Sequence, residues 1–237
     1  MTERAEAILR RVNVTGATPV SVIPHGAAAS PPNSSRPRDA APLLLTWGLL
    51  GPGKGIQWVI DALAQLKDLD PAPLYVIAGQ THPKVFARDG DAYRDSLKRR
   101  VESNDVGHMV EFDNSYRDLP SLGSLISEAD VVILPYDSRE QATSGVLVDA
   151  VAAGRPVIAT AFPHAVELLG SGAGIVVAHE NATELSEAIR RILTDHELAS
   201  AMAAEAGRLA PGLSWESVGA QYRDLAARVL QRVGAVA

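Results

Sequence analysis

A glycine-rich octapeptide, GLLGPGKG, occupies residues 48–55. Glycines let the backbone approach a phosphate closely, and Lys54 supplies a positive charge that suits a diphosphate. The octapeptide follows an apolar run that we expect to form a strand, and it precedes an expected helix whose N-terminus would face the anion. This pattern predicts a site for a phosphorylated ligand, with Gly48 and Lys54 as candidate binding residues.

A second candidate site follows the apolar run 131–134, where Pro135 ends an expected strand and a polar loop begins. The loop leads into Ser144 and Gly145, at which we expect a helix to start and to expose backbone N–H groups to an anion. Asp149 lies about two turns into this helix and has the chemistry to accept hydrogen bonds from sugar hydroxyls. The segment therefore adds phosphate-binding and sugar-binding candidates to the glycine loop.

Alternating strand and helix patterns from residue 43 onward would position both loops. The expected strands are short continuous apolar runs, as is typical when helices cover both faces of a parallel sheet. We predict an α/β fold: a doubly wound parallel six-stranded Rossmann-like sheet with helices on both faces and a helical C-terminus. The expected strands are 43–47, 74–78, 109–112, 131–134, 156–159 and 174–177, and the expected helices are 55–66, 92–103, 121–129, 144–153, 165–169, 182–193, 196–208 and 214–233.

The first 42 residues have a different character. We expect a short helix over 3–11, an extended segment over 19–23, and a linker over 27–42 that is rich in Ala, Pro, Ser and Asn. The sequence thus predicts two parts, an N-terminal helix, junction and linker (1–42) and a Rossmann-like domain with C-terminal helices (43–237).

Composition narrows the function further. The net charge of −6 argues against a general nucleic-acid binder, which needs a basic face. The chain has no cysteine, and its six histidines show no metal-ligand spacing, so we expect no metal site. It lacks an apolar run long enough to cross a bilayer and the apolar core of a signal peptide, so we expect a cytoplasmic protein without a transmembrane segment.

Several segments together resemble glycosyltransferase family 4. The run DAVAAGRPV at 149–157 is similar to the tail of its donor-binding signature, which reads Glu, seven residues, and then Glu-Ala-Met-Ala-x-Gly-x-Pro-Val. The glycine loop resembles the Gly-Arg-x-x-x-x-Lys-Gly segment of this family, with Leu49 in place of the Arg. Two further segments, IPHG at 23–26 and SWE at 214–216, resemble the domain junction and the start of the last helix.

The resemblance implies the C-terminal, donor-binding half of a two-domain GT-B enzyme. Such an enzyme transfers a sugar with retention from a nucleotide-diphosphate donor and typically requires no metal or other cofactor. The residues matching its motifs would then bind the donor diphosphate (Gly48, Lys54, Ser144, Gly145), the ribose (Asp149) and the border of the sugar cleft (His25).

The acidic residue beside the transferred sugar is displaced in this chain. Counting back eight positions from Asp149 reaches Gln141, which is not a carboxylate, whereas one inserted loop residue would align Glu140 with the motif. Glu140 is therefore the candidate catalytic residue. Asp149 itself is one methylene shorter than the usual Glu.

Three functions stay open at this point. The first is a glycosyltransferase that needs an N-terminal acceptor domain, from this or a separate chain, to act on an acceptor that the sequence does not identify. The second is a non-catalytic nucleotide-sugar-binding or interaction module, which Leu49 and the displaced acidic residue favour. The third is a P-loop phosphotransferase, which Gly48, Gly53 and Lys54 fit, although Gly55 stands where that motif needs a Ser or Thr for Mg²⁺.

Overall fold

A computed structural model describes residues 2–13, 16, 18–28 and 40–234 of the chain. Its centre is a parallel six-stranded sheet in the order β3-β2-β1-β4-β5-β6. This order confirms the predicted doubly wound sheet. The strands are β1 (Leu43–Trp47), β2 (Leu74–Ala78), β3 (Val110–Asp113), β4 (Val131–Leu134), β5 (Val157–Thr160) and β6 (Gly174–Val177).

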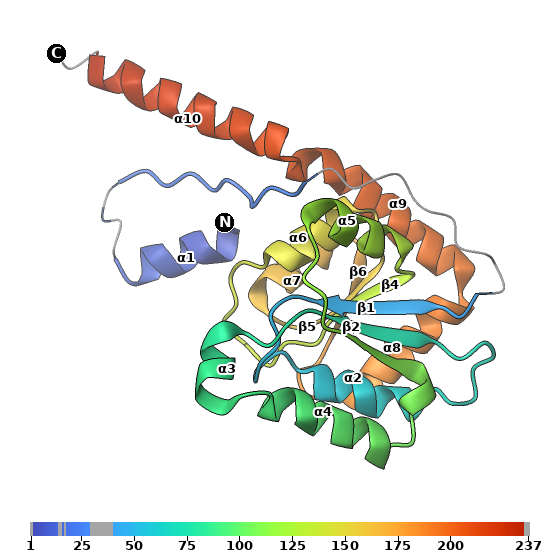
Figure 1. Cartoon of the computed structure of the whole chain (residues 1–237). Helices are drawn as coiled ribbons and strands as arrows, with labels where there is room; N and C mark the ends of the chain where they lie inside the picture. Colours follow the sequence, from blue (N-terminus) through green and yellow to red (C-terminus); the bar gives the residue numbers. More distant parts are fainter. Residues whose placement is uncertain (1, 14–15, 17, 29–39, 235–237) are drawn as a thin grey trace.

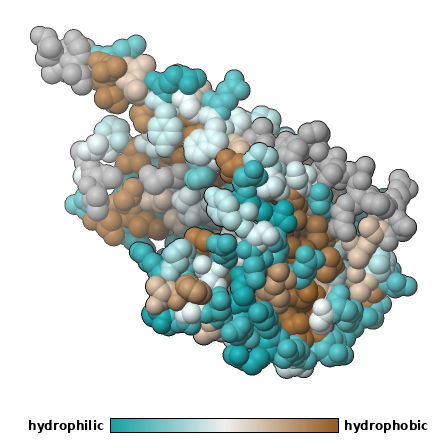
Figure 2. All heavy atoms as spheres, in the orientation of Figure 1, coloured by the Kyte–Doolittle hydropathy of each residue, from teal (hydrophilic) through white to brown (hydrophobic). Residues whose placement is uncertain are grey.

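Helices cover both faces of the sheet (Figure 1). One face packs against α2 (Ile56–Leu63), α4 (Ala92–Ser103) and α8 (Ala182–Thr194). The other packs against α5 (Leu119–Glu128), α6 (Gly145–Ala152), α7 (Pro163–Leu169) and α9 (His196–Leu213). Helix α10 (Trp215–Gly234) projects beyond these layers (Figure 1), and Figure 2 shows apolar residues exposed along it.

The central strand β1 illustrates why the strands are apolar throughout. Leu45 and Trp47 face one cluster of buried side chains, and Leu44 faces the other. Thr46 is buried as well, but its hydroxyl donates to the Ile133 carbonyl (2.6 Å) and accepts from the Tyr75 hydroxyl (2.8 Å). A buried polar group that is paired in this way costs little, so β1 tolerates it.

Helix α3 (Pro83–Asp89) was not predicted from the sequence. Its start is encoded locally, because Pro83 occupies the first turn and Nδ1 of His82 accepts a hydrogen bond from the Lys84 amide (3.1 Å). Histidine is an uncommon helix cap, and the helix has only seven residues, so the sequence pattern gave no clear signal. Helix α3 lies over the glycine loop, where a Cβ on Gly51 would be 3.1 Å from Val85.

Several predicted boundaries differ from those of the structure, and two of them have a clear local cause. Met109 belongs to a 3₁₀ turn, Gly107–Met109, so the third strand begins at Val110. Helix α9 continues to Leu213 and includes Pro211, whereas the expected helix ended at residue 208. A proline inside a helix removes one backbone hydrogen bond and clashes with the preceding turn, so the sequence favours an end before Pro211, whereas the helix continues past it.

The N-terminal part contains the expected short helix α1 (Glu3–Arg11). The Glu167 carboxylate accepts from the amides of Glu3 (3.0 Å) and Arg4 (3.3 Å), which holds the start of α1 against α7. The expected extended segment 19–23 has no strand partner within the described ranges. Most of the expected linker, residues 29–39, lies outside the described residues.

Candidate functional site

Both candidate loops lie at the point where the strand order reverses. The strands β1 and β4 are neighbours, and the chain leaves them toward opposite sides of the sheet. Ligands of open α/β sheets bind at such a crevice, at the carboxyl ends of the strands. The glycine loop follows β1 and the polar loop follows β4, and the two are joined by a hydrogen bond from the Asp137 amide to the Gly53 carbonyl (3.0 Å).

Gly55 closes the glycine loop at the start of α2, with φ of +67°. A Cβ at this position would lie 1.7 Å from the Pro135 carbonyl oxygen, so neither Ser nor Thr fits. The nearby Asp137 carboxylate accepts from Trp58 Nε1 (2.9 Å) and Gln57 Nε2 (3.4 Å). The P-loop hypothesis therefore lacks its hydroxyl, and the Asp137 carboxylate beside the loop is already bound by two side chains.

The Lys54 side chain lies across the glycine loop. Its ammonium nitrogen is 4.5 Å from the centre of the Tyr136 ring and about as far (4.0 Å) from where a Cβ on Gly48 would be. Burial lowers the pKa of this amine from its ordinary value of 10.5. Among the described residues, no carboxylate comes within ion-pair distance of it. Lys54 borders a hollow of about 290 Å³, together with Leu49, Gly53 and Gln141.

The start of α6 is held by side chains on both sides. The Ser144 hydroxyl caps the helix by accepting from the Leu147 amide (3.2 Å), and the Ser144 amide donates to Nδ1 of His164 (2.9 Å). Burial lowers the pKa of His164 to about 4, so this ring is neutral and its Nδ1 is an acceptor at neutral pH. Ser144 is thus occupied in positioning the helix, and the N–H groups beyond it are the ones left for a ligand.

His25 lies beside the same helix start. Its ring packs on Trp215 (centroids 5.3 Å apart) and comes 3.3 Å from the position that a Cβ on Gly145 would take. Asp149 is half-buried on α6, and burial raises the pKa of its carboxyl, an effect that the nearby His25 opposes. The structure therefore brings His25, Gly145 and Asp149 together, as the sequence-based hypothesis requires.

The two alternatives for the displaced acidic residue have different surroundings. Gln141 lines the hollow beside Lys54, and its side-chain amide donates to the Thr143 carbonyl (3.3 Å). Glu140 is exposed and is not among the residues that line this hollow. In this conformation, the position predicted by direct counting, Gln141, faces the site.

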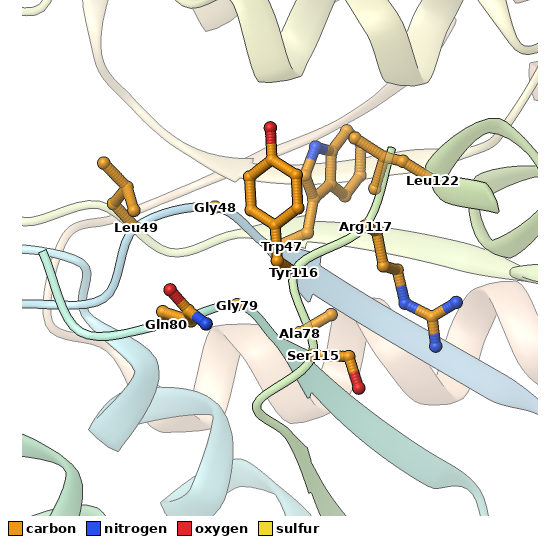
Figure 3. Close-up of a pocket in the computed structure, with 10 residues that line it drawn as sticks. All are labelled: Trp47, Gly48, Leu49, Ala78, Gly79, Gln80, Ser115, Tyr116, Arg117 and Leu122. Carbon is orange, nitrogen blue, oxygen red and sulfur yellow. The ribbon is translucent and has the colours of Figure 1, made fainter. Parts of the chain in front are cut away.

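A second hollow, of about 160 Å³, adjoins the first at Leu49 (Figure 3). The Tyr116 ring stands in front of the Trp47 indole and is 86% exposed, whereas Trp47 is buried (Figure 3). Arg117 points away from the two rings and pairs with Asp113 (2.6 Å). The second hollow therefore has an aromatic face and lies next to the hollow that Lys54 borders.

Sequence reasoning did not assign roles to Tyr116, Trp47, His82 or His164. All four lie at or just beyond the carboxyl end of a strand, which is the one signal that would have selected them. Aromatic residues at such places are common in cores, so their type alone did not distinguish a site from packing.

Comparison with known proteins bears directly on this site. The family described as glycosyl transferases group 1 matches residues 31–208. The chain belongs to this family. It is 29% identical over 174 residues to an alpha-D-kanosaminyltransferase of Streptomyces kanamyceticus, and the match covers 72% of this chain and 41% of that protein. The chain thus spans well under two thirds of the length of this relative.

Several solved structures share the fold of this chain. Sucrose-phosphate synthase of Thermosynechococcus elongatus superposes with a TM-score of 0.81 and 26% identity, over 98% of this chain and 58% of that one. WaaG, a glycosyltransferase involved in lipopolysaccharide biosynthesis, superposes with a TM-score of 0.70 and 24% identity, over 92% of this chain and 60% of WaaG. HepE of Anabaena, solved with UDP and glucose, superposes with a TM-score of 0.68 and 22% identity, over 80% of this chain and 48% of HepE.

Two other expectations concern membrane spans and metal sites in the described part of the chain. No helix there is long and apolar enough to cross a membrane. No group of three or more His, Asp or Glu side chains gathers there as a metal site would require. That the glycosyl transfer needs no metal or other cofactor stays a prediction.

Proposed function

We propose that this group 1 glycosyltransferase chain binds the nucleotide-diphosphate part of a sugar donor, and that it is the donor half of a retaining enzyme whose acceptor domain lies elsewhere. The observation that carries the proposal is the Lys54 ammonium, which is half-buried at the strand-order crevice and lacks a carboxylate partner among the described residues. A partly desolvated cation of this kind is best satisfied by an anion, and the hollow beside it has room for one.

The chemistry of the site favours departure of a diphosphate. Negative charge builds up on the leaving diphosphate as the bond to the sugar breaks, and a fixed cation stabilises it more in a water-poor crevice than in bulk water. Lys54 would supply the charge, and the N–H groups at the start of α6, from Gly145 onward, would supply hydrogen-bond donors and the helix dipole. Asp149, on the same helix, would accept from the ribose hydroxyls, and Glu140 or Gln141 would border the sugar.

The nucleobase would occupy the Trp47–Tyr116 hollow, which adjoins the Lys54 hollow through Leu49. Stacking of a base on an aromatic ring contributes about 1–3 kcal/mol. We expect Tyr116→Ala to weaken UDP binding about fivefold or more and to leave pyrophosphate binding within about twofold of wild type. Isothermal titration calorimetry measures both ligands. Tyr222→Ala, which removes an exposed ring from α10, is the matched control, and equal losses for UDP and pyrophosphate would refute a base-stacking role.

The proposed function is tested by titrating the chain with UDP, GDP and ADP, each with Mg²⁺ and with EDTA. We expect at least one diphosphate to bind, with an affinity that EDTA changes less than about threefold, and the corresponding monophosphate to bind about tenfold more weakly. The reason is that Lys54 and the backbone amides, rather than a metal, hold the second phosphate. If none of the three diphosphates binds, donor binding is refuted. Binding that depends on Mg²⁺ would instead support a phosphotransferase.

A non-catalytic binding module is the second candidate, and Leu49 favours it. This side chain borders both hollows and is 48% exposed, and it offers a phosphate none of the hydrogen bonds of the Arg that the family carries there. Hydrolysis or transfer of the sugar from a bound donor, measured with a matching acceptor domain present, separates the two candidates.

A further inference from the structure

The Tyr136 ring beneath Lys54 is buried, and contacts on several sides hold the residue in place. Tyr136 is only 2% exposed, and its ring stacks on Phe162 with centroids 5.4 Å apart. Its carbonyl oxygen accepts from the Thr160 hydroxyl (2.6 Å) and from Nδ1 of His179 (2.9 Å). Residues at the end of β5 and just beyond β5 and β6 thus immobilise Tyr136, which lies just beyond β4.

We propose that Tyr136 is a positioning residue of the phosphate site: its ring holds the Lys54 ammonium across the glycine loop before a ligand arrives. The inference rests on the proposed function, because it gives Tyr136 a role in binding the donor diphosphate. The geometry that carries it is the 4.5 Å separation between the ammonium nitrogen and the ring centre, on a ring that cannot turn away.

The physical reason is the flexibility of lysine. A free lysine side chain has many rotamers, and ordering it on ligand binding reduces affinity. A cation over an aromatic face is attracted to it, and more strongly where water is excluded. The ring therefore orders the side chain in advance, while the ammonium keeps N–H donors that the ring face does not use.

The Tyr136 hydroxyl is not part of this role. The hydroxyl is buried near Ser144 and has no hydrogen-bond partner among the described residues. Removing the hydroxyl while keeping the ring should therefore preserve binding, whereas removing the ring should not. Comparing these two changes distinguishes the contribution of the Tyr136 ring from that of its hydroxyl.

The test is a double-mutant cycle read by calorimetry with UDP. We expect Tyr136→Leu to weaken UDP binding about five- to tenfold, Tyr136→Phe to stay within about twofold of wild type, and Tyr136→Leu to have less than about a twofold effect once Lys54→Ala is present. Equal losses from Tyr136→Leu with and without Lys54 would overturn the positioning role.

A ligand-free measurement tests the same contact. Protons above an aromatic face are shifted upfield in NMR spectra, so the ε-methylene protons of Lys54 should be shifted upfield in the wild type and in Tyr136→Phe, and should return to ordinary values in Tyr136→Leu. The absence of a shifted lysine signal that Lys54→Ala removes would overturn the inference even if UDP binds. If the shift is present and UDP does not bind, the proposed function fails while the Tyr136–Lys54 contact stands, and its role in donor binding falls with that function.

Discussion

Lys54→Ala is expected to weaken UDP binding about 30- to 100-fold. The variant removes the half-buried cation of the crevice, and a hydrogen bond to a charged group contributes about 1.5–3 kcal/mol, to which the direct attraction between ammonium and diphosphate adds. Because the methylene stem is only partly packed, the fold should tolerate the change. Titration calorimetry with UDP gives the affinity, and circular dichroism checks that the fold is intact.

Lys67→Ala is the matched control for this variant. Lys67 follows α2, near the amino ends of the strands and away from the crevice at their carboxyl ends. It pairs with the exposed Asp105 (3.2 Å). Its removal changes the net charge of the chain by the same amount and should leave UDP affinity within about twofold. A comparable loss in both variants would mean that overall charge, not the Lys54 site, attracts the ligand.

Gly55→Ser is expected to destabilise the fold by about 3–5 kcal/mol, among the larger effects that one substitution causes. The added Cβ would lie 1.7 Å from the Pro135 carbonyl oxygen, a backbone atom that cannot give way cheaply. The positive φ of +67° adds strain for any residue with a side chain. Urea denaturation followed by fluorescence measures the free energy of unfolding.

A second glycine provides the comparison. Gly107 lies in open space with ordinary φ, so Gly107→Ser should change the free energy of unfolding by less than about 1 kcal/mol. If Gly55→Ser were equally mild, the close approach of the loops after β1 and β4 would be wrong, and the exclusion of a P-loop hydroxyl at this position would lose its basis.

The order of the elements and the parallel sheet could be predicted because each strand is a short run of apolar residues between turn signals. Leu44 and Leu45 belong to opposite faces of one strand, and only helices on both sides explain why both are apolar. Helix α3 could not be predicted in the same way, since its start depends on a histidine cap. The end of α9 likewise depended on a tertiary bridge, in which the Ala27 amide donates to the Leu213 carbonyl (2.7 Å).

The site could be predicted only as far as the loops themselves. Gly48, Lys54 and Asp149 were selected by their spacing and by the family that the sequence resembles. The surroundings that give Lys54 its properties come from β4, β5 and β6 at once, through Tyr136, Phe162 and His179. No local pattern links residues so far apart in the chain, so the ring beneath the ammonium became visible only in three dimensions.

The most direct test of diphosphate binding at Lys54 is a crystal structure of this chain with UDP. We predict phosphate oxygens within hydrogen-bond distance of Lys54 Nζ, close to the N-terminal amides of α6, and the uracil ring between Leu49 and Tyr116. A UDP molecule bound with its phosphates away from Lys54, in crystals grown well above the dissociation constant, would contradict this account of the site.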